Sequence, residues 1–118
     1  MIFNNISVGV DCVEISRFDN VDENFFKKVF SERERNYCES KILPLEHYAA
    51  RFAGKEAVIK AISGFVDLKD IYKIEILNEE SGKPYVKLNG KISATFEFSI
   101  SLSHSKKNAI AFVIANKI

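Results

Sequence analysis

Glu56 is a carboxylate in an unexpected position on the longest predicted helix. On a helix that turns by about 100° per residue, Glu56 falls within ~40° of Leu45, Ala49 and Phe52, inside the apolar sector. An ionised carboxylate in that sector needs a partner, because burying it unpaired is costly. We therefore expect it to be paired, protonated or bound to a cation. The simplest alternative is an ordinary surface pair with Lys60, four residues further on.

Asp11 is the second carboxylate of interest. It follows a short run, residues 6–10, in which apolar side chains occupy every second position, a pattern typical of a buried strand. Asp11 could cap a helix that begins near Val13. Alternatively, Asp11 and Glu56 together with phosphate oxygens of a ligand would form the kind of site that Mg²⁺ prefers. This second interpretation predicts a diphosphate ligand.

Basic and polar side chains could complete such a site or could simply face solvent. Arg51, Lys55 and Lys60 could neutralise a diphosphate, although basic residues on a helix usually form a solvated face. His104 shares the parity of the apolar residues before it, so it is either a hydrogen-bonded histidine at a strand end or part of a site. Its serine neighbours lack the glycine-flanked elbow of a serine hydrolase.

Length and composition indicate one globular domain over residues 1–118. The chain is 47% hydrophobic and 28% charged, and 17 Lys and Arg against 16 Asp and Glu give a net charge of +1. This balance favours neither nucleic acid nor an anionic membrane as a partner. No signal segment or stretch of ~20 apolar residues is present, so we expect a cytoplasmic protein. Cys12 and Cys38 lack the spacing of a zinc or redox site and are expected to be buried thiols.

The elements that must position these side chains are helices in the first half and strands in the second. We expect a strand over 6–13, two short helices between 22 and 37 with a capping box from Ser31 to Glu34, and a long helix over 45–63 after Pro44. Four more strands are predicted over 72–77, 84–88, 91–102 and 109–115, with a hairpin signal at Asn89-Gly90. The predicted fold class is α+β, with helices packed on an antiparallel sheet.

Several motifs, taken in order, resemble those of holo-acyl-carrier-protein synthase, the small type of 4'-phosphopantetheinyl transferase. The resemblance covers essentially the whole chain. The motifs are Gly9-Val10-Asp11 with Glu14 and Arg17, Arg51-Phe52-Ala53-Gly54-Lys55-Glu56-Ala57 with Lys60-Ala61, Gly82-Lys83-Pro84-Tyr85, and Ser101-Leu102-Ser103-His104-Ser105.

The resemblance implies a fold, a reaction and a set of roles. It implies the 4'-phosphopantetheinyl transferase fold, a homotrimer with active sites between subunits, and transfer of phosphopantetheine from coenzyme A to a serine of apo acyl carrier protein. Asp11 and Glu56 would hold Mg²⁺ on the diphosphate, Glu56 would act as the base, and Lys60 would contact the transferred phosphate. Adenosine 3',5'-bisphosphate would leave. The coenzyme A contacts would be Arg51, Lys55, Lys60, Gly82, Lys83, Pro84 and His104, and Arg17 would dock the carrier protein.

Two segments depart from the pattern of that family. Ile62-Ser63-Gly64-Phe65 stands where the family commonly has a Gly-Thr-Gly loop near the nucleotide, and acidic residues (Asp19, Asp22 and Glu23) come where basic ones often follow the position of Arg17. Two other functions remain open. One is a coenzyme A-binding module without activity, and the other is a structural interaction domain whose charged helix forms only salt bridges.

Overall fold

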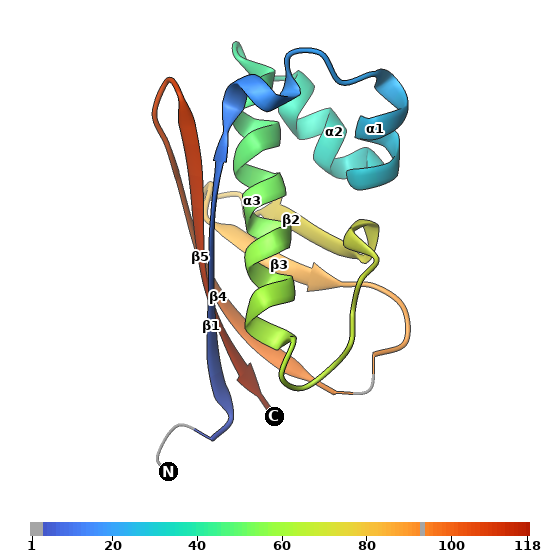
Figure 1. The fold of residues 1–118 in the computed structure, drawn as a ribbon, viewed down its shortest axis with the longest axis vertical. Helices are drawn as coiled ribbons and strands as arrows, with labels where there is room; N and C mark the ends of the chain where they lie inside the picture. The colour runs from blue at the N-terminus through green and yellow to red at the C-terminus, as the bar shows by residue number, and fades with distance from the viewer. Residues whose placement is uncertain (1–3, 93) are drawn as a thin grey trace.

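A long strand comes first, a helical region follows it, and strands make up most of the second half of the chain (Figure 1). The computed structural model describes residues 4–92 and 94–118. In chain order the elements are β1 (Ile6–Glu14), the 3-10 turn η1 (Ile15–Phe18), α1 (Glu23–Val29), α2 (Glu32–Glu39), α3 (Pro44–Ile62), the 3-10 turn η2 (Ile71–Lys73), β2 (Ile74–Asn78), β3 (Pro84–Leu88), β4 (Phe96–His104) and β5 (Asn108–Lys117).

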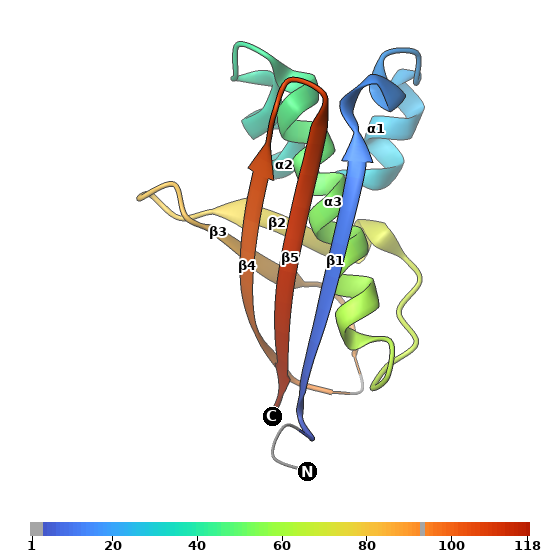
Figure 2. The same ribbon diagram turned by 60° about the vertical axis from the view of Figure 1, so that its left-hand side comes forward.

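The strands form two antiparallel sheets that pack against α3. β1, β5 and β4 make one sheet in that spatial order, and β2 pairs with β3 in the other. Figure 2 shows the β2–β3 ribbon running across the direction of the first sheet. α1 and α2 lie at the end of the molecule where α3 begins (Figure 1). The predicted class, helices packed on antiparallel strands, is confirmed.

Small side chains let α3 lie close to the first sheet. The buried face of the helix is lined by alanines, and β5 presents alanines from the opposite side, so the two backbones approach each other with few large side chains between them. The buried alanines are Ala49, Ala50, Ala53, Ala57 and Ala61 of α3 and Ala109, Ala111 and Ala115 of β5. We call this close contact between α3 and the first sheet the seam. It positions the residues at its edge.

The helix boundaries follow from the capping residues in the sequence. In the predicted capping box, Ser31 Oγ accepts a hydrogen bond from the Glu34 amide at 3.2 Å, and the Glu34 carboxylate accepts one from the Ser31 amide at 3.0 Å. Asp22 caps α1 by accepting from the Phe25 amide at 3.0 Å. Pro44 stands in the first turn of α3, where its missing N–H costs nothing.

The hairpin predicted at Asn89-Gly90 is wrong. Within the described residues β3 and β4 belong to different sheets, so the chain bends at Gly90 and crosses between them instead of folding back. The hairpins are β2–β3 and β4–β5. The strand predicted over 91–102 begins only at Phe96, and Ser93 of that range lies outside the described residues. The strand predicted from residue 72 begins at Ile74, because η2 precedes it.

β1 presents its two faces to different surroundings. Gly9 and Val13 are buried on the side of α3, whereas Val8, Val10 and Cys12 are exposed on the opposite side. The prediction that the apolar positions of this run are buried is therefore wrong for the chain taken alone. The prediction of a buried thiol is wrong for Cys12 and confirmed for Cys38. Because α3 packs so closely on β1, the face of the strand that carries Gly9 lies against the helix. Val8, Val10 and Cys12 therefore lie on the opposite, exposed face.

Candidate active site

Gly9 determines how closely β1 approaches α3. A Cβ atom at this position would lie 2.0 Å from the Ala57 carbonyl oxygen and 2.9 Å from the Ala61 amide nitrogen. Both neighbours are helix backbone, which cannot move aside, so glycine is required here for close approach. The contact brings the next residues of β1 to the surface of α3.

Asp11 lies in the middle of β1 and pairs with Lys60 of α3. Lys60 Nζ lies 3.0 Å from Asp11 Oδ1 and also donates to the Val10 carbonyl oxygen at 3.0 Å. The Asp11 side chain is 18% exposed and that of Lys60 is 53% exposed, so the pair stands at the edge of the seam. The helix-cap interpretation of Asp11 is wrong, because Glu14 is the residue that precedes the helical turn η1.

β1 and α3 run in opposite directions along each other (Figure 1). Gly9 lies against the turn of α3 that carries Ala57, near the end of the helix. Phe18, which follows β1, packs on Phe52 of α3 with the ring centroids 5.5 Å apart. Going from Gly9 toward Phe18 therefore corresponds to going backwards along α3.

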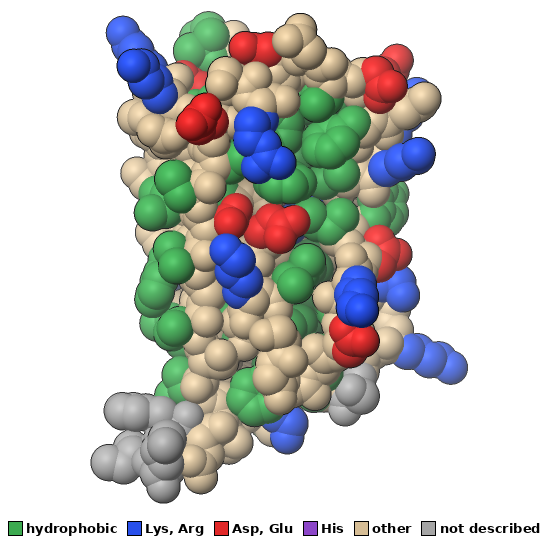
Figure 3. All heavy atoms as spheres, in the orientation of Figure 1, with side chains coloured by type: hydrophobic (Ala, Val, Ile, Leu, Met, Phe, Trp, Pro, Cys, Tyr) green, Lys and Arg blue, Asp and Glu red, His purple; other side chains and the backbone are tan. Residues whose placement is uncertain are grey.

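This antiparallel course brings Asp11 to the level of Glu56. Asp11 is about 7 Å beyond Gly9 along the strand, and Glu56 lies four residues, about 6 Å along the helix axis, before Lys60. Glu56 is half-buried, as its place in the apolar sector predicts. Lys60 has Asp11 as its acidic partner, where the sequence suggested Glu56. Figure 3 shows acidic and basic side chains gathered over the face where β1 and α3 lie.

The donor set at this edge fits a magnesium ion better than a zinc ion. Asp11 and Glu56 offer carboxylate oxygens from two facing elements. Within the described residues, no group of three or more His, Cys, Asp or Glu side chains gathers as a complete metal site. Structural zinc needs four such ligands, whereas Mg²⁺ takes one or two carboxylates and completes its shell with waters and substrate phosphates.

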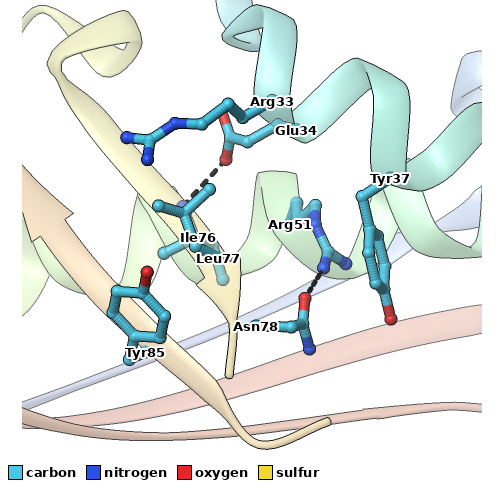
Figure 4. Close-up of a pocket in the computed structure, with 8 residues that line it drawn as sticks. All are labelled: Arg33, Glu34, Tyr37, Arg51, Ile76, Leu77, Asn78 and Tyr85. Atoms are coloured by element: carbon cyan, nitrogen blue, oxygen red, sulfur yellow. Dashed lines mark hydrogen bonds between the residues drawn. The ribbon is translucent and has the colours of Figure 1, made fainter. Parts of the chain in front are cut away.

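A second polar group surrounds the guanidinium of Arg51 (Figure 4). Arg51 Nη2 donates to Asn78 Oδ1 at the end of β2, and the guanidinium carbon lies 3.9 Å from the centroid of the Tyr37 ring. Asn78 Nδ2 in turn donates to the Gly82 carbonyl oxygen at 2.9 Å. The structure therefore brings together Arg51 and the turn 82–84, two segments far apart in the sequence that were both expected to contact coenzyme A.

The Arg51 group lines a cavity of about 230 Å³. Arg51 is only 2% exposed, and within the described residues its Nε atom has no hydrogen-bond partner. A buried donor without a partner is unfavourable, and the guanidinium is positively charged, so this cavity suits an anionic group. The lining residues, drawn in Figure 4, are Arg33, Glu34, Tyr37, Arg51, Ile76, Leu77, Asn78 and Tyr85.

Lys55 has a different environment from the one expected of a coenzyme A contact. Its ammonium is fully buried and lies 2.7 Å from Glu34 Oε1, which is also fully buried, and it donates to the Ile74 carbonyl oxygen. Burial lowers the pKa of Lys55, although Glu34 acts in the opposite direction. Glu34 Oε2 also accepts from the Ile76 amide at 2.9 Å. Lys55 thus joins α3 to α2 and β2, because it projects from the inner side of the helix.

Glu75 anchors α2 to β2 and has no motif that marks it in the sequence. It accepts hydrogen bonds from Ser31 Oγ at 2.6 Å, Arg33 Nη2 at 2.8 Å and Asn89 Nδ2 at 2.9 Å. Burial opposes ionisation, but the hydrogen bonds from Arg33, Ser31 and Asn89 outweigh it and lower the pKa of Glu75 to about 2. In the sequence, the sign that Glu75 has a buried partner is its position between apolar residues at the start of β2.

His104 ends β4 and connects through aromatic rings to the Arg51 group. Its Nδ1 lies 3.4 Å from Glu46 Oε2, and its ring centroid lies 5.7 Å from that of His47. His47 in turn lies 5.8 Å from the Tyr37 ring that covers Arg51. Burial, and secondarily the charge of Arg51, lowers the pKa of His47. His104 therefore belongs to the same end of the molecule as Arg51.

The segment 82–84 closes the β2–β3 hairpin. Gly82 has a φ of 92°, a left-handed conformation that favours glycine, and its amide donates to the Glu79 carbonyl oxygen at 2.8 Å. Lys83 is exposed, and Pro84 is the first residue of β3, where a strand tolerates proline. The segment thus presents a lysine beside the residues that hold Arg51.

Arg17 is exposed in η1, directly after β1. Its guanidinium carbon lies 5.7 Å from the centroid of the Phe52 ring. After Lys60, Ile62 is buried and the Ser63 hydroxyl donates to the Lys60 carbonyl oxygen at 3.0 Å. The chain therefore closes α3 just beyond the Asp11–Lys60 pair without the glycine-rich loop of the resemblance.

Comparison with known proteins places this architecture among transferases. Residues 7–113 match the family model ACPS, described as the 4'-phosphopantetheinyl transferase superfamily. A holo-[acyl-carrier-protein] synthase of Cytophaga hutchinsonii is 42% identical, with 93% of this chain and 96% of the relative covered. A holo-[acyl-carrier-protein] synthase of Clostridium tetani is 40% identical, with 92% and 94% covered.

Solved structures agree with the sequence comparison. An ACPS–CoA complex of Chronobacterium ammoniagenes superimposes with a TM-score of 0.83 at 30% identity and covers 96% of this chain and 98% of its own. A holo-(acyl-carrier-protein) synthase of Bacillus anthracis in complex with CoA (3',5'-ADP) has a TM-score of 0.78 at 28% identity, covering 95% and 96%.

Proposed function

Because the chain belongs to the holo-acyl-carrier-protein synthase family of 4'-phosphopantetheinyl transferases, we propose that it transfers phosphopantetheine from coenzyme A to apo acyl carrier protein. Membership of the family gives the enzyme class, and the residues described above supply the parts of the reaction. We also propose that residues 1–118 form a single transferase domain, because one buried cluster joins β1, α3 and β5. In the part of the chain that the structure describes, no helix has the length and apolar character to span a membrane.

The observation that carries the proposal is the pairing of Asp11 with Lys60 at the edge of the β1–α3 seam, with half-buried Glu56 four residues before Lys60 on α3. Gly9 makes this pairing possible, and the 3.0 Å contact between Lys60 Nζ and Asp11 Oδ1 defines it. We propose that Asp11, Glu56 and Lys60 together would hold a metal-bound diphosphate, because Mg²⁺ takes one or two carboxylates with substrate phosphates. This arrangement supports phosphoryl transfer and gives no reason to expect serine-hydrolase chemistry.

The reaction transfers one phosphopantetheinyl group through its phosphorus atom and moves one proton. The hydroxyl oxygen of the carrier serine bonds to the β-phosphorus of coenzyme A, and the bond from that phosphorus to the bridging oxygen breaks, releasing adenosine 3',5'-bisphosphate. Glu56, directly or through a water, accepts the serine proton. Lys60 neutralises charge on the transferred phosphate. When bound by Asp11 and Glu56, a magnesium ion would stabilise the diphosphate charge.

The coenzyme A contacts that we propose are Arg51, Lys60, the turn 82–84 and His104. They are supported by the cavity beside Arg51, by the link from Asn78 to the turn and by the rings that connect His104 to Tyr37. Lys55 is not retained, because its buried pair with Glu34 leaves the ammonium no exposed surface. Arg17 remains the proposed contact for the acidic carrier protein, since it is exposed beside the site.

An exposed apolar patch supports assembly of the chain with further copies of itself, and the family resemblance implies that the assembly is a homotrimer. On the face of the sheet away from α3, three cross-strand pairs of β1 and β5 stand side by side, and most of their side chains are large and apolar. Such a face is normally covered by protein. We propose that this sheet patch forms the interface between three copies, with active sites shared across it. The pairs are Val8 with Ile114, Val10 with Phe112, and Cys12 with Ile110.

The test is to incubate the chain with coenzyme A, Mg²⁺ and an apo acyl carrier protein and to measure the carrier by mass spectrometry. A gain of about 340 Da on the serine is expected, from the mass of the transferred group. The gain should disappear when Mg²⁺ is chelated. Binding of coenzyme A without any mass gain over several carriers would instead support a module that binds but does not react.

A further inference from the structure

We propose that Asn78 is a positioning residue that holds the coenzyme A-binding turn 82–84 against Arg51. Asn78 is the last residue of β2, outside every motif that carried the family resemblance. The inference rests on the proposed function, because it concerns how the proposed contacts for coenzyme A are kept in register.

The amide of Asn78 makes one hydrogen bond in each direction. Its Oδ1 accepts from Arg51 Nη2 on α3, and its Nδ2 donates to the Gly82 carbonyl oxygen at 2.9 Å. A guanidinium can only donate and a carbonyl can only accept, so this pair of partners also determines which way the amide is turned. An aspartate could not donate to the turn, and a lysine could not accept from Arg51. The amide is therefore matched to both partners.

The turn has its own hydrogen bonds, and they serve a different purpose. The Glu79 amide donates to the Lys83 carbonyl oxygen at 2.9 Å, and the Gly82 amide donates to the Glu79 carbonyl oxygen at 2.8 Å. These bonds fix the shape of the hairpin. The side chain of Asn78 adds the connection from the hairpin to α3.

Arg51 is held firmly enough to act as the reference point. Arg51 is only 2% exposed, and its guanidinium lies on the face of the Tyr37 ring (Figure 4). Fixing the turn to this group orders two parts of the ligand site before the ligand arrives. Without Asn78 the ligand must order them itself, which weakens binding without changing the reaction.

The test compares Asn78→Ala and Asn78→Leu with Asn36→Ala, the same type of change at an exposed asparagine of α2. Leucine keeps the volume and the neutral charge of the side chain but makes neither hydrogen bond. Both Asn78 variants should raise the KM for coenzyme A by about 3- to 10-fold, the effect of losing a net hydrogen bond. The kcat and the KM for the carrier should stay within about two-fold, because ligand binding alone is affected.

Two further measurements separate positioning from general loss of structure. The Kd for adenosine 3',5'-bisphosphate, measured by calorimetry without carrier, should rise by the same factor as the KM. Hydrogen exchange over residues 79–84 should be faster in the Asn78 variants and unchanged in Asn36→Ala. An unchanged KM for coenzyme A, unchanged exchange in the turn, or an equal loss of kcat with both substrates would overturn the proposal. If the wild-type chain itself neither binds coenzyme A nor transfers, the proposed function fails first.

Discussion

Replacing Gly9 with alanine should separate β1 from α3 and damage the site next to the contact. The added Cβ would lie 2.0 Å from the Ala57 carbonyl oxygen, and ordinary contact begins at 3.4 Å, so the strand must retreat by about 1.4 Å. Forcing an extra carbon into such a seam costs about 1–3 kcal/mol. For a domain of this size the Tm should fall by roughly 5–15 °C.

The loss of activity should exceed the loss of stability. Val10 and Asp11, the two residues after Gly9, accept the 3.0 Å hydrogen bonds from Lys60, and a shift of more than 1 Å would break both. Misplacing reacting groups by about 1 Å can cost ~10²-fold in rate. We therefore expect kcat/KM for phosphopantetheine transfer to fall by about 100-fold at a temperature where circular dichroism shows the variant folded.

The assay is the mass gain of the carrier over time, with thermal unfolding followed in parallel. Gly64→Ala is the matched control for stability, because a Cβ at position 64 meets nothing within 4 Å. Its Tm should stay the same or rise slightly. A Gly9→Ala variant with the wild-type Tm and a kcat/KM within about three-fold of wild type would refute this account of the seam and the site.

The remaining predictions concern the metal site, the carrier, the assembly and acid stability. Asp11→Asn and Glu56→Gln should each stay folded and lose about 100-fold or more in kcat, as when one electrostatic group of a transition state is removed; near wild-type turnover in both variants would end the magnesium assignment. Arg17→Ala should raise the KM for apo carrier more than the KM for coenzyme A, most clearly at low salt, because a charge at the edge of an interface mainly steers association. A raised KM for coenzyme A with an unchanged KM for the carrier would place Arg17 in the nucleotide site. Light scattering should give about three times 13.4 kDa, and Phe112→Glu should shift the mass toward one copy and lower activity; a fully active monomer would remove shared sites from the proposal. Glu75→Gln should lower the free energy of unfolding at pH 7 by up to about 3 kcal/mol, because its pKa is lowered from 4.5 to about 2 on folding. The wild-type carboxylate stabilises the fold above pH 4.5 and loses this effect as the pH falls toward 2. The free energies of unfolding of wild type and Glu75→Gln should therefore converge over that range, and a difference that stays constant with pH would contradict the hydrogen bonds assigned to Glu75.

Local signals were sufficient for much of the fold. Pro44, Asp22 and the capping box from Ser31 to Glu34 begin the helices where expected, since a cap depends on residues three or four positions apart. The Asn89-Gly90 hairpin failed for the opposite reason. A turn signal states that the chain can reverse, but which strands pair depends on the sheet that each strand joins.

The sequence also predicts Asp11, Glu56 and Lys60 as candidate site residues, because a charged residue among apolar neighbours can be recognised without coordinates. Their partners were not visible. Lys60 pairs with Asp11, forty-nine residues away, and not with Glu56 on the same helix. Only the crossing of β1 over α3 at Gly9 decides that partner.

The roles of Lys55, Glu75 and Asn78 were decided by the tertiary structure alone. In the sequence Lys55 looks no different from Lys60, whose side chain is 53% exposed, yet Lys55 is buried against Glu34, which comes from a different helix. Glu75 and Asn78 hold together segments distant in the chain, and nothing in their immediate neighbours records those contacts. A sequence shows which residues can cap, turn or carry charge, because these properties are local. Burial and pairing between distant elements exist only once α3 has packed against both sheets.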